Sequence, residues 1–188
     1  MSHSVYYTGK GDHGNTVRLG GAERVPKVSA LIEAIGTLDE ATSAIGMARA
    51  LARVPRLQEI APTIQRHIYV LLSHLSATPD ARDRYTGLAQ SHIDWLEQRI
   101  AELEVGLPPL HDFVLPGESP GGAAFHVART VVRRAERRLV ALTELEPNLG
   151  EANMAYLNRL SSLLFVAALQ EDRAEGSAPQ LARGEVDG

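Results

Sequence analysis

The chain has 188 residues, a formal net charge of −4 and no cysteine, so disulfides and thiolate metal sites are excluded. Hydrophobic residues make up 44% of the chain and aromatic residues only 5%, a composition that favours helices around one core. Because the chain lacks a basic excess, we expect neither nucleic acid nor an anionic membrane surface as a partner.

The N-terminal ten residues contain no apolar core of signal-peptide length. No run anywhere reaches the roughly 18 to 20 uncharged apolar residues that a membrane-spanning helix needs. We therefore expect a soluble cytoplasmic protein, unless a targeting signal has been removed.

The first half of the chain predicts a loop and two helices. Glycines interrupt any helical period in residues 1–27, which is typical of an ordered loop. Apolar residues at helical spacing predict one helix from Val28 to Val54. A second period from Ile60 to Leu75 predicts another helix with Pro62 in its first turn. Residues 78–86, with one proline and four charges, predict an exposed connection.

A third helix is predicted from Leu88 to Leu103, and it ends at Gly106 before two prolines. The loop that follows covers residues 107–122. Its centre, Phe113 to Gly117, is apolar and bounded by residues that break helices. We expect this centre to be a short extended segment pressed against another part of the protein.

The last two helices are predicted over residues 123–145 and 150–169, joined by a connection short enough to make them antiparallel neighbours. Residues 171–188 lack an apolar period and are expected to be disordered. The predicted fold is all-α: one domain over residues 1–170, a five-helix bundle with a glycine-rich N-terminal loop over residues 1–27.

The N-terminal loop has a composition that suits a polyphosphate. Residues 7–16 combine glycines, hydroxyl groups and Lys10, so backbone amides, hydroxyls and a cation can all face an anion. No window matches the glycine and lysine spacing of a P-loop. A mobile glycine-rich arm explains the same composition equally well.

The fourth predicted helix carries five arginines within ten residues, 129–138. At about 100° per residue, Arg129, Arg133 and Glu136 fall within an arc of roughly 60°. Guanidinium groups suit phosphate oxygens and buried carboxylates. The alternative is a solvated charged face with pairs three and four residues apart, although so many arginines repel one another unless an anion lies among them.

Two further polar features are open to two interpretations. Asp39 lies near the apolar face of the first predicted helix, where an acid needs a cation such as Arg129, but an ordinary exposed acidic pair with Glu40 is equally consistent. Asn158 in the last helix can bind a ligand or a neighbouring helix end. The seven histidines show no spacing that completes a set of metal ligands.

Six segments, taken together and in this order, resemble the propanediol-utilisation type of ATP:cob(I)alamin adenosyltransferase. They span residues 6 to 166. The segments are Tyr7-Thr8 with Gly11-Asp12, Gly14 and Thr16; Arg24-Val25 with Lys27; Gly36-Thr37-Leu38-Asp39-Glu40 with Ser43-Ala44-Ile45-Gly46; Phe113-Val114-Leu115-Pro116-Gly117; Ala128-Arg129-Thr130 through Arg133-Arg134-Ala135-Glu136-Arg137; and Tyr156-Leu157-Asn158-Arg159-Leu160-Ser161.

The resemblance implies an enzyme that transfers the 5′-deoxyadenosyl group of ATP to the cobalt of cob(I)alamin or another corrinoid, and releases triphosphate. It implies a homotrimer of ferritin-like five-helix bundles, with ATP bound at the subunit interfaces by the N-terminal loop, residues 1–27, of one subunit. It also implies that Asp39 pairs with Arg129 of a neighbour and that Phe113 lies below the corrin as the group that displaces the lower ligand. Mg²⁺ would be held mainly by the ATP phosphates. The implied ATP-binding residues are Thr8, Gly9, Lys10, Gly11, Thr16, Val17, Lys27, Arg133, Arg134, Glu136, Arg137 and Asn158.

The resemblance also implies further partners, namely a reductase that supplies an electron and an enzyme that uses adenosylcobalamin. The chain departs from the family pattern at Gly9-Lys10, at Ala41-Thr42 and at Ser162, where an aspartate is usual. The departures at Ala41-Thr42 and Ser162 favour an alternative, a non-catalytic trimeric carrier or sensor of ATP or a corrinoid. The retained Phe113, Asp39 and Arg129 favour the enzyme. A plain helical interaction module would leave the glycine loop and the arginine cluster without a purpose.

Overall fold

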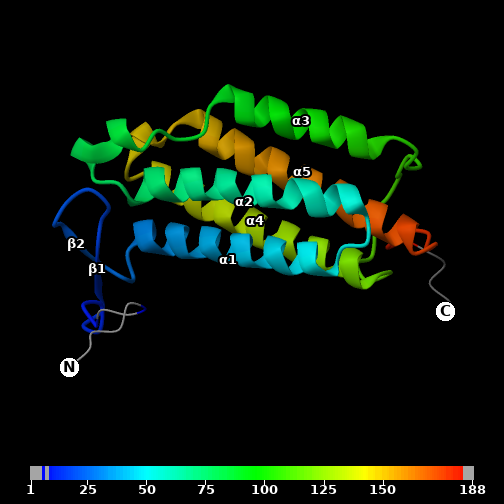
Figure 1. Cartoon of the computed structure of the whole chain (residues 1–188), viewed down its shortest axis with the longest axis horizontal. Helices are drawn as coiled ribbons and strands as arrows, with labels where there is room; N and C mark the ends of the chain where they lie inside the picture. Colours follow the sequence, from blue (N-terminus) through cyan, green and yellow to red (C-terminus); the bar gives the residue numbers. More distant parts are fainter. Residues whose placement is uncertain (1–5, 7–8, 184–188) are drawn as a thin grey trace.

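The computed structural model describes residue 6 and residues 9–183, apart from the side chain of Asn148. Five α-helices lie side by side along the long axis, which confirms the predicted all-α bundle (Figure 1). In chain order the elements are β1 (Asn15–Val17), β2 (Arg24–Pro26), α1 (Ala30–Leu51), α2 (Pro55–Ser76), the 3-10 helix η1 (Pro79–Arg84), α3 (Gln90–Glu104), α4 (Pro120–Thr143), the 3-10 helix η2 (Pro147–Leu149) and α5 (Glu151–Ala174).

The core of the bundle is aliphatic and follows a heptad pattern on α1. Ala34, Ala41 and Ala48 are fully buried and lie seven residues apart, and Leu38 and Ile45 fill the positions between them. Small side chains at this spacing let two helix backbones approach closely, while the larger ones pack into the neighbouring helix. Helix α1 packs against α4 and α2, and α5 packs against α4 and α3.

Local signals explain where two of the helices begin. The Ser29 hydroxyl accepts a hydrogen bond from the backbone amide of Ile32 at 3.4 Å, and the Ser119 hydroxyl accepts one from Gly122 at 2.9 Å. Each serine thereby satisfies an amide in the first turn of α1 or α4 that has no partner within the helix.

Helix α2 begins earlier than its apolar period predicts. Pro55 is its first residue and Leu57 is buried in the first turn, so Pro62 lies inside the helix rather than at its start. The prediction for Pro62 was wrong because the period was counted from Ile60 and missed the preceding turn.

The N-terminal region contains a small sheet as well as turns. Strands β1 and β2 pair antiparallel with Thr16 opposite Val25, and Leu19 forms a further bridge with Ala77 after α2. We call residues 9–27 the N-terminal hairpin. It lies at one end of the bundle, and the loop between α3 and α4 lies at the other (Figure 1).

The C-terminal region corrects one prediction. Disorder was expected from residue 171, but α5 runs to Ala174, and Glu171 and Asp172 are among the most buried residues of the chain. The Asp172 carboxylate accepts a hydrogen bond from the Ser119 hydroxyl at 2.7 Å. Both acids point into the bundle because they bind polar groups at the starts of other helices.

The described chain after α5 contacts the loop between α3 and α4. Leu181 forms an antiparallel bridge with Val114, so the apolar centre of the α3–α4 loop does press against another segment, as predicted. Residues 184–188 lie outside the described part of the chain. Among the described residues, no helix has the length and apolar character needed to cross a membrane.

Candidate functional site

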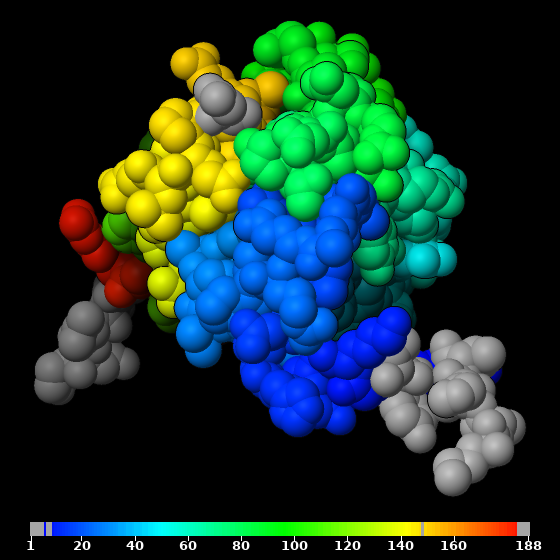
Figure 2. All heavy atoms as spheres, turned by 90° about the vertical axis from the view of Figure 1, so that its left-hand side faces the viewer, coloured from blue at the N-terminus to red at the C-terminus, as the bar shows by residue number. Residues whose placement is uncertain are grey.

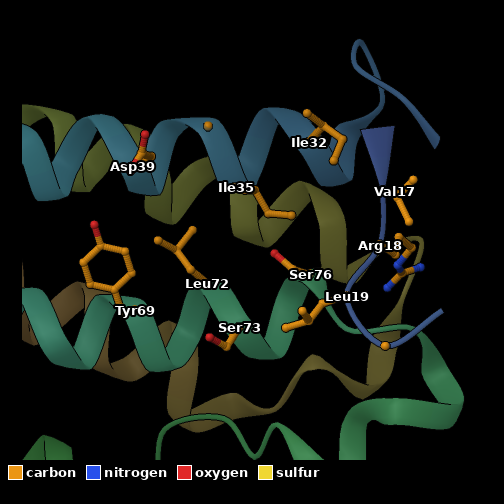
Figure 3. Close-up of a pocket in the computed structure, with 12 residues that line it drawn as sticks. Val17, Arg18, Leu19, Ile32, Ile35, Asp39, Tyr69, Leu72, Ser73 and Ser76 are labelled. Carbon is orange, nitrogen blue, oxygen red and sulfur yellow. The ribbon is translucent and has the colours of Figure 1, made fainter. Parts of the chain in front are cut away.

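A hollow of about 590 Å³ opens between α1, α2 and the segment that follows β1. Ile35 on α1 and Leu72 on α2 give it an apolar floor, and Val17 closes one side (Figure 3). Asp39 on α1 and Tyr69 on α2 bring two polar groups to its wall. An apolar hollow with few polar groups is the usual form of a small-molecule site.

The N-terminal hairpin is ordered by backbone turns and by Arg24. Gly9 and Gly14 have φ values of +66° and +74°, which glycine adopts without strain. The Arg24 guanidinium donates hydrogen bonds to the backbone carbonyls of Lys10 at 2.7 Å and Asn15 at 3.4 Å. These carbonyls are therefore held by a cation of the hairpin itself.

A second hollow of about 230 Å³ lies on this hairpin, lined by Lys10, Gly11, Thr16, Val17 and neighbouring residues. A Cβ atom at position 11 would lie 3.1 Å from the Lys27 ammonium nitrogen, so glycine lets that cation approach the backbone. Most of the predicted loop residues thus come together on one hairpin. Thr8 lies outside the described residues.

A third hollow, of about 330 Å³, contains the predicted residues of the last two helices. Arg133, Glu136 and Arg137 of α4 line it together with Asn158 of α5. The Asn158 amide donates a hydrogen bond to the Glu136 carboxylate at 3.0 Å, and the Arg137 guanidinium donates one to the carbonyl of Arg133 at 3.0 Å. We call this hollow the arginine pocket.

Arg134 belongs to a different face of α4. Its guanidinium forms an ion pair with Glu40 of α1, and Arg138 pairs with Glu33 of α1 at 3.3 Å. Arg134 does not line the arginine pocket, although the sequence grouped it with Arg133 as an ATP ligand. Arg134 and Arg138 therefore fit the alternative interpretation of the sequence, a solvated charged face, because their ion pairs are exposed.

Arg129 and Asp39 do not meet within the described part of one chain, since no ion pair joins them there. Arg129 is half-buried, and its Nε has no hydrogen-bond partner among the described residues. Burial, together with the charge of nearby Arg133, lowers the pKa of the Arg129 guanidinium. Asp39 is exposed on the wall of the 590 Å³ hollow. Their predicted contact across a subunit boundary stays a prediction.

Phe113 is an exposed aromatic residue on a fixed backbone. Its side chain is 80% exposed, which is unusual for a phenylalanine. Its carbonyl accepts a hydrogen bond from the Ala182 amide at 2.7 Å, and the Leu115 amide donates one to the carbonyl of Gln180 at 2.8 Å. The ring is thus presented to the surroundings by a loop that the C-terminal segment holds in place.

Sequence reasoning missed some residues of these hollows. Arg24 was part of a matching segment but had no assigned role. Its partners are backbone carbonyls that come close only when the hairpin turns, so the sequence alone did not indicate them. Tyr69 follows buried Ile68 on α2, so the apolar period gave no reason to single it out. Among the described residues, no three histidine or acidic side chains gather as a set of metal ligands.

Comparison with known proteins identifies the family. The cobalamin adenosyltransferase family matches residues 6–171. A corrinoid adenosyltransferase of Mycobacterium tuberculosis is 42% identical over 164 residues, which cover 85% of this chain and 84% of that protein. Corrinoid adenosyltransferase PduO of Salmonella typhimurium is 37% identical over 169 residues, which cover 88% of this chain and 49% of that protein. The chain therefore spans about half the length of the PduO relative.

Solved structures agree with the sequence relatives. A phenylalanine-to-alanine variant of the PduO-type ATP:corrinoid adenosyltransferase from Lactobacillus reuteri, complexed with cobalamin and ATP, superposes with a TM-score of 0.87 at 30% identity, covering 95% of this chain and 99% of that one. An arginine-to-lysine variant of that enzyme, complexed with ATP, gives a TM-score of 0.86 at 29% identity, covering 94% and 99%. This chain belongs to the cobalamin adenosyltransferase family.

Proposed function

We propose that this chain transfers the 5′-deoxyadenosyl group of ATP to the cobalt of a reduced corrinoid and releases triphosphate. The observation that carries the proposal is the presence of two basic hollows, on the N-terminal hairpin and in the arginine pocket, in a chain of this family. Relatives at 37% to 42% identity are named corrinoid adenosyltransferases. Cations and backbone amides around a polyphosphate suit a reaction whose leaving group is triphosphate.

The ATP site proposed here is shared between subunits of a homotrimer. The hairpin and the arginine pocket form separate hollows in one chain, an arrangement that suits a site whose two halves come from neighbouring chains. Arg129, whose Nε is unpartnered among the described residues, and exposed Asp39 are suited to pair across that boundary. The proposed ATP ligands are Thr8, Gly9, Lys10, Gly11, Thr16, Val17, Lys27, Arg133, Glu136, Arg137 and Asn158. Arg134 would join them only by exchanging its Glu40 partner for the nucleotide.

In the proposed reaction, cob(I)alamin attacks the 5′ carbon of the ATP ribose. The cobalt–carbon bond forms as the bond between that carbon and the triphosphate oxygen breaks. Arg133, Arg137 and Lys27 stabilise the negative charge of the departing triphosphate, and the protein contributes orientation rather than acid–base chemistry. Mg²⁺ would be held mainly by the phosphate oxygens, with Glu136 as the carboxylate of the arginine pocket that fits it.

Phe113 has the properties that a displacing group below the corrin needs. Its ring is apolar, exposed and mounted on a backbone held by hydrogen bonds to the C-terminal segment. Placed against the lower face of the corrin, it would exclude both the base ligand and water, which makes Co(II) easier to reduce. We further propose a cytoplasmic enzyme that receives its electron from a reductase and passes adenosylcobalamin to an enzyme that depends on it.

Incubation of the full chain with MgATP and chemically reduced cobalamin tests the proposal. We expect the absorption spectrum of adenosylcobalamin and one triphosphate for each product molecule. MgATP binding without either product would contradict the enzyme and favour the carrier or sensor that the departure at Ser162 allows.

Substitution of Phe113 by alanine separates catalysis from binding. Phe113→Ala should retain MgATP binding, because the basic hollows lie elsewhere, but lose most activity when the reaction starts from Co(II). The loss should be much smaller when Co(I) is supplied, since Co(I) needs no displacement of a lower ligand. Leu115→Ala, two residues along the same loop, controls for disturbance of the backbone. Equal losses from both cobalt states would show that Phe113 only supports the loop.

A further inference from the structure

Arg18 follows directly after β1 and carries a buried charge. The residue is 8% exposed, and its guanidinium donates hydrogen bonds to the backbone carbonyls of Ala77 at 2.6 Å and Leu75 at 3.5 Å. Burial of a guanidinium to this depth costs free energy unless several carbonyls or carboxylates contact it. Its partners therefore show what the residue holds together.

The first partner is the C-terminal end of α2. The last carbonyls of a helix have no partner within the helix and carry partial negative charge, so a buried cation there is favourable. The backbone continues the contact, because the Leu19 amide donates to the Ser76 carbonyl at 2.8 Å and the Thr78 amide donates to the Leu19 carbonyl at 2.9 Å. Arg18 and Leu19 thus fix the hairpin to the end of α2.

The second partner is the connection between α4 and α5. Glu146 of that connection lies 3.6 Å from the Arg18 guanidinium and also pairs with Arg82 of η1. Glu23 of the hairpin adds a weaker contact at 3.9 Å. Figure 2 shows the hairpin, in blue, against the green segment around η1 and close to the yellow α4–α5 connection. One buried cation joins these parts at this end of the molecule.

The hairpin needs such an anchor. Strands β1 and β2 have three residues each, and an isolated hairpin of this length is not stable in water. The residues directly before Arg18, Thr16 and Val17, line the hollow on the hairpin, and Val17 to Gly20 line the larger hollow beside Asp39 (Figure 3). The position of Arg18 therefore determines where the hairpin residues that line these two hollows lie.

We infer that Arg18 is a positioning residue for ATP, which holds the N-terminal hairpin in its binding geometry through the end of α2 and Glu146. This inference rests on the proposed function. It assigns Arg18 no contact with the nucleotide. Loss of the anchor leaves the phosphate ligands in the chain but no longer ordered before ATP arrives, so binding weakens while the chemical step at saturation is preserved.

Arg18→Met tests the inference because it keeps the length and most of the apolar stem while removing the charge. By calorimetric titration of the full chain with MgATP, we expect the dissociation constant to rise about tenfold or more. In steady-state assays KM for ATP should rise similarly, with kcat changed by less than about threefold. Amide hydrogen exchange at Leu19 and Thr78 should become faster, which reports the loosened anchor directly.

Arg18→Lys and Arg56→Met are the matched variants. Lysine retains a cation that can reach the Ala77 carbonyl, so it should restore MgATP affinity to within about threefold of the parent. Arg56→Met removes an exposed arginine that pairs with Glu59 and Glu102 away from the hairpin, and should leave the affinity within about twofold. If Arg18→Met does not fold, Glu146→Gln removes the second anchor while Arg18 stays, and should still weaken MgATP binding.

Two outcomes separate the failure of this inference from that of the proposed function. A parent that binds MgATP and a folded Arg18→Met that binds it equally well would show that Arg18 only stabilises the fold. A parent that binds no MgATP would overturn the proposed function, and the assignment of Arg18 to ATP with it.

Discussion

Glu171 shows how a buried acid near the end of α5 can stabilise a distant helix. The residue is 1% exposed, and its carboxylate accepts hydrogen bonds from the backbone amides of Arg53 at 2.8 Å and Val54 at 3.0 Å. Val54 is the N-cap position of α2 and has no side-chain cap of its own. Glu171 therefore caps α2 from another helix, at the end of the dipole where negative charge is favourable.

The cost of removing this charge follows from the two bonds. Hydrogen bonds to a charged group contribute about 1.5 to 3 kcal/mol each, and the helix terminus adds up to about 2 kcal/mol, offset by desolvation of the carboxylate. Glu171→Gln keeps the shape and one acceptor but turns an amide group toward the other backbone N–H. We expect a loss of about 3 kcal/mol in the free energy of unfolding, which lowers Tm by about 6 to 12 °C for a chain of this size.

Thermal and urea unfolding of the full chain at one fixed protein concentration measure this loss, because assembly makes apparent stability depend on concentration. Glu59→Gln is the control: its carboxylate is exposed and pairs only with Arg56 at 3.0 Å among the described residues. It should cost less than about 0.5 kcal/mol. If Glu171→Gln costs no more than Glu59→Gln, the cap assigned to Glu171 contributes nothing.

Three further predictions concern the nucleotide, the assembly and pH. MgATP at 100 to 1,000 times its dissociation constant should raise the free energy of unfolding of the parent by about 3 to 4 kcal/mol, measured by thermal unfolding. Arg133→Ala should lose most of this stabilisation, whereas Arg138→Ala should retain it. Asp39→Asn should weaken the proposed trimer by a few kcal/mol in sedimentation, unlike Glu40→Gln, and a fully active parent monomer at micromolar concentration would contradict the interface. Burial, with a smaller effect of a neighbouring histidine, lowers the pKa of His67 from 6.5 to about 4. Between pH 4 and 6.5, His67 is protonated in the unfolded chain but neutral in the folded one, so the free energy of unfolding should fall as pH drops from 6.5 to 4. His67→Gln should reduce this pH dependence, measured by urea unfolding at each pH.

The helices and their order could be predicted because they depend on local periodicity. Leu38 and Ile45 repeat at the spacing of a buried helical face, and Gly106 marks the end of α3. The apolar centre of the α3–α4 loop also indicated a packed segment. The sequence did not reveal that Leu181 of the tail is the partner, since pairing between distant segments leaves no local pattern.

Buried charges were among the features that sequence reasoning missed. Glu171 and Asp172 looked like part of a polar tail because a charged side chain is exposed in most contexts. The partners of Glu171 are the backbone amides of Arg53 and Val54, which lie 118 and 117 residues away in the sequence. The partner of Asp172 is the Ser119 hydroxyl. Arg18 was missed for the same reason, since its hydrogen-bond acceptors are carbonyls at the end of α2 and its partner Glu146 is distant in the sequence.

The arginines of α4 show why a single chain leaves the site incomplete. Arg134 and Arg138 are neutralised by acids of α1 in the same chain, whereas no ion pair of Arg129, Arg133 or Arg137 is found among the described residues. Glu136 is the acidic side chain of the arginine pocket, and a further anion would reduce the remaining repulsion between Arg129 and Arg133. In the proposed trimer both the Asp39 carboxylate of a neighbour and the ATP phosphates supply that anion. Thermodynamic linkage then requires that assembly strengthen ATP binding and that ATP strengthen assembly by the same factor.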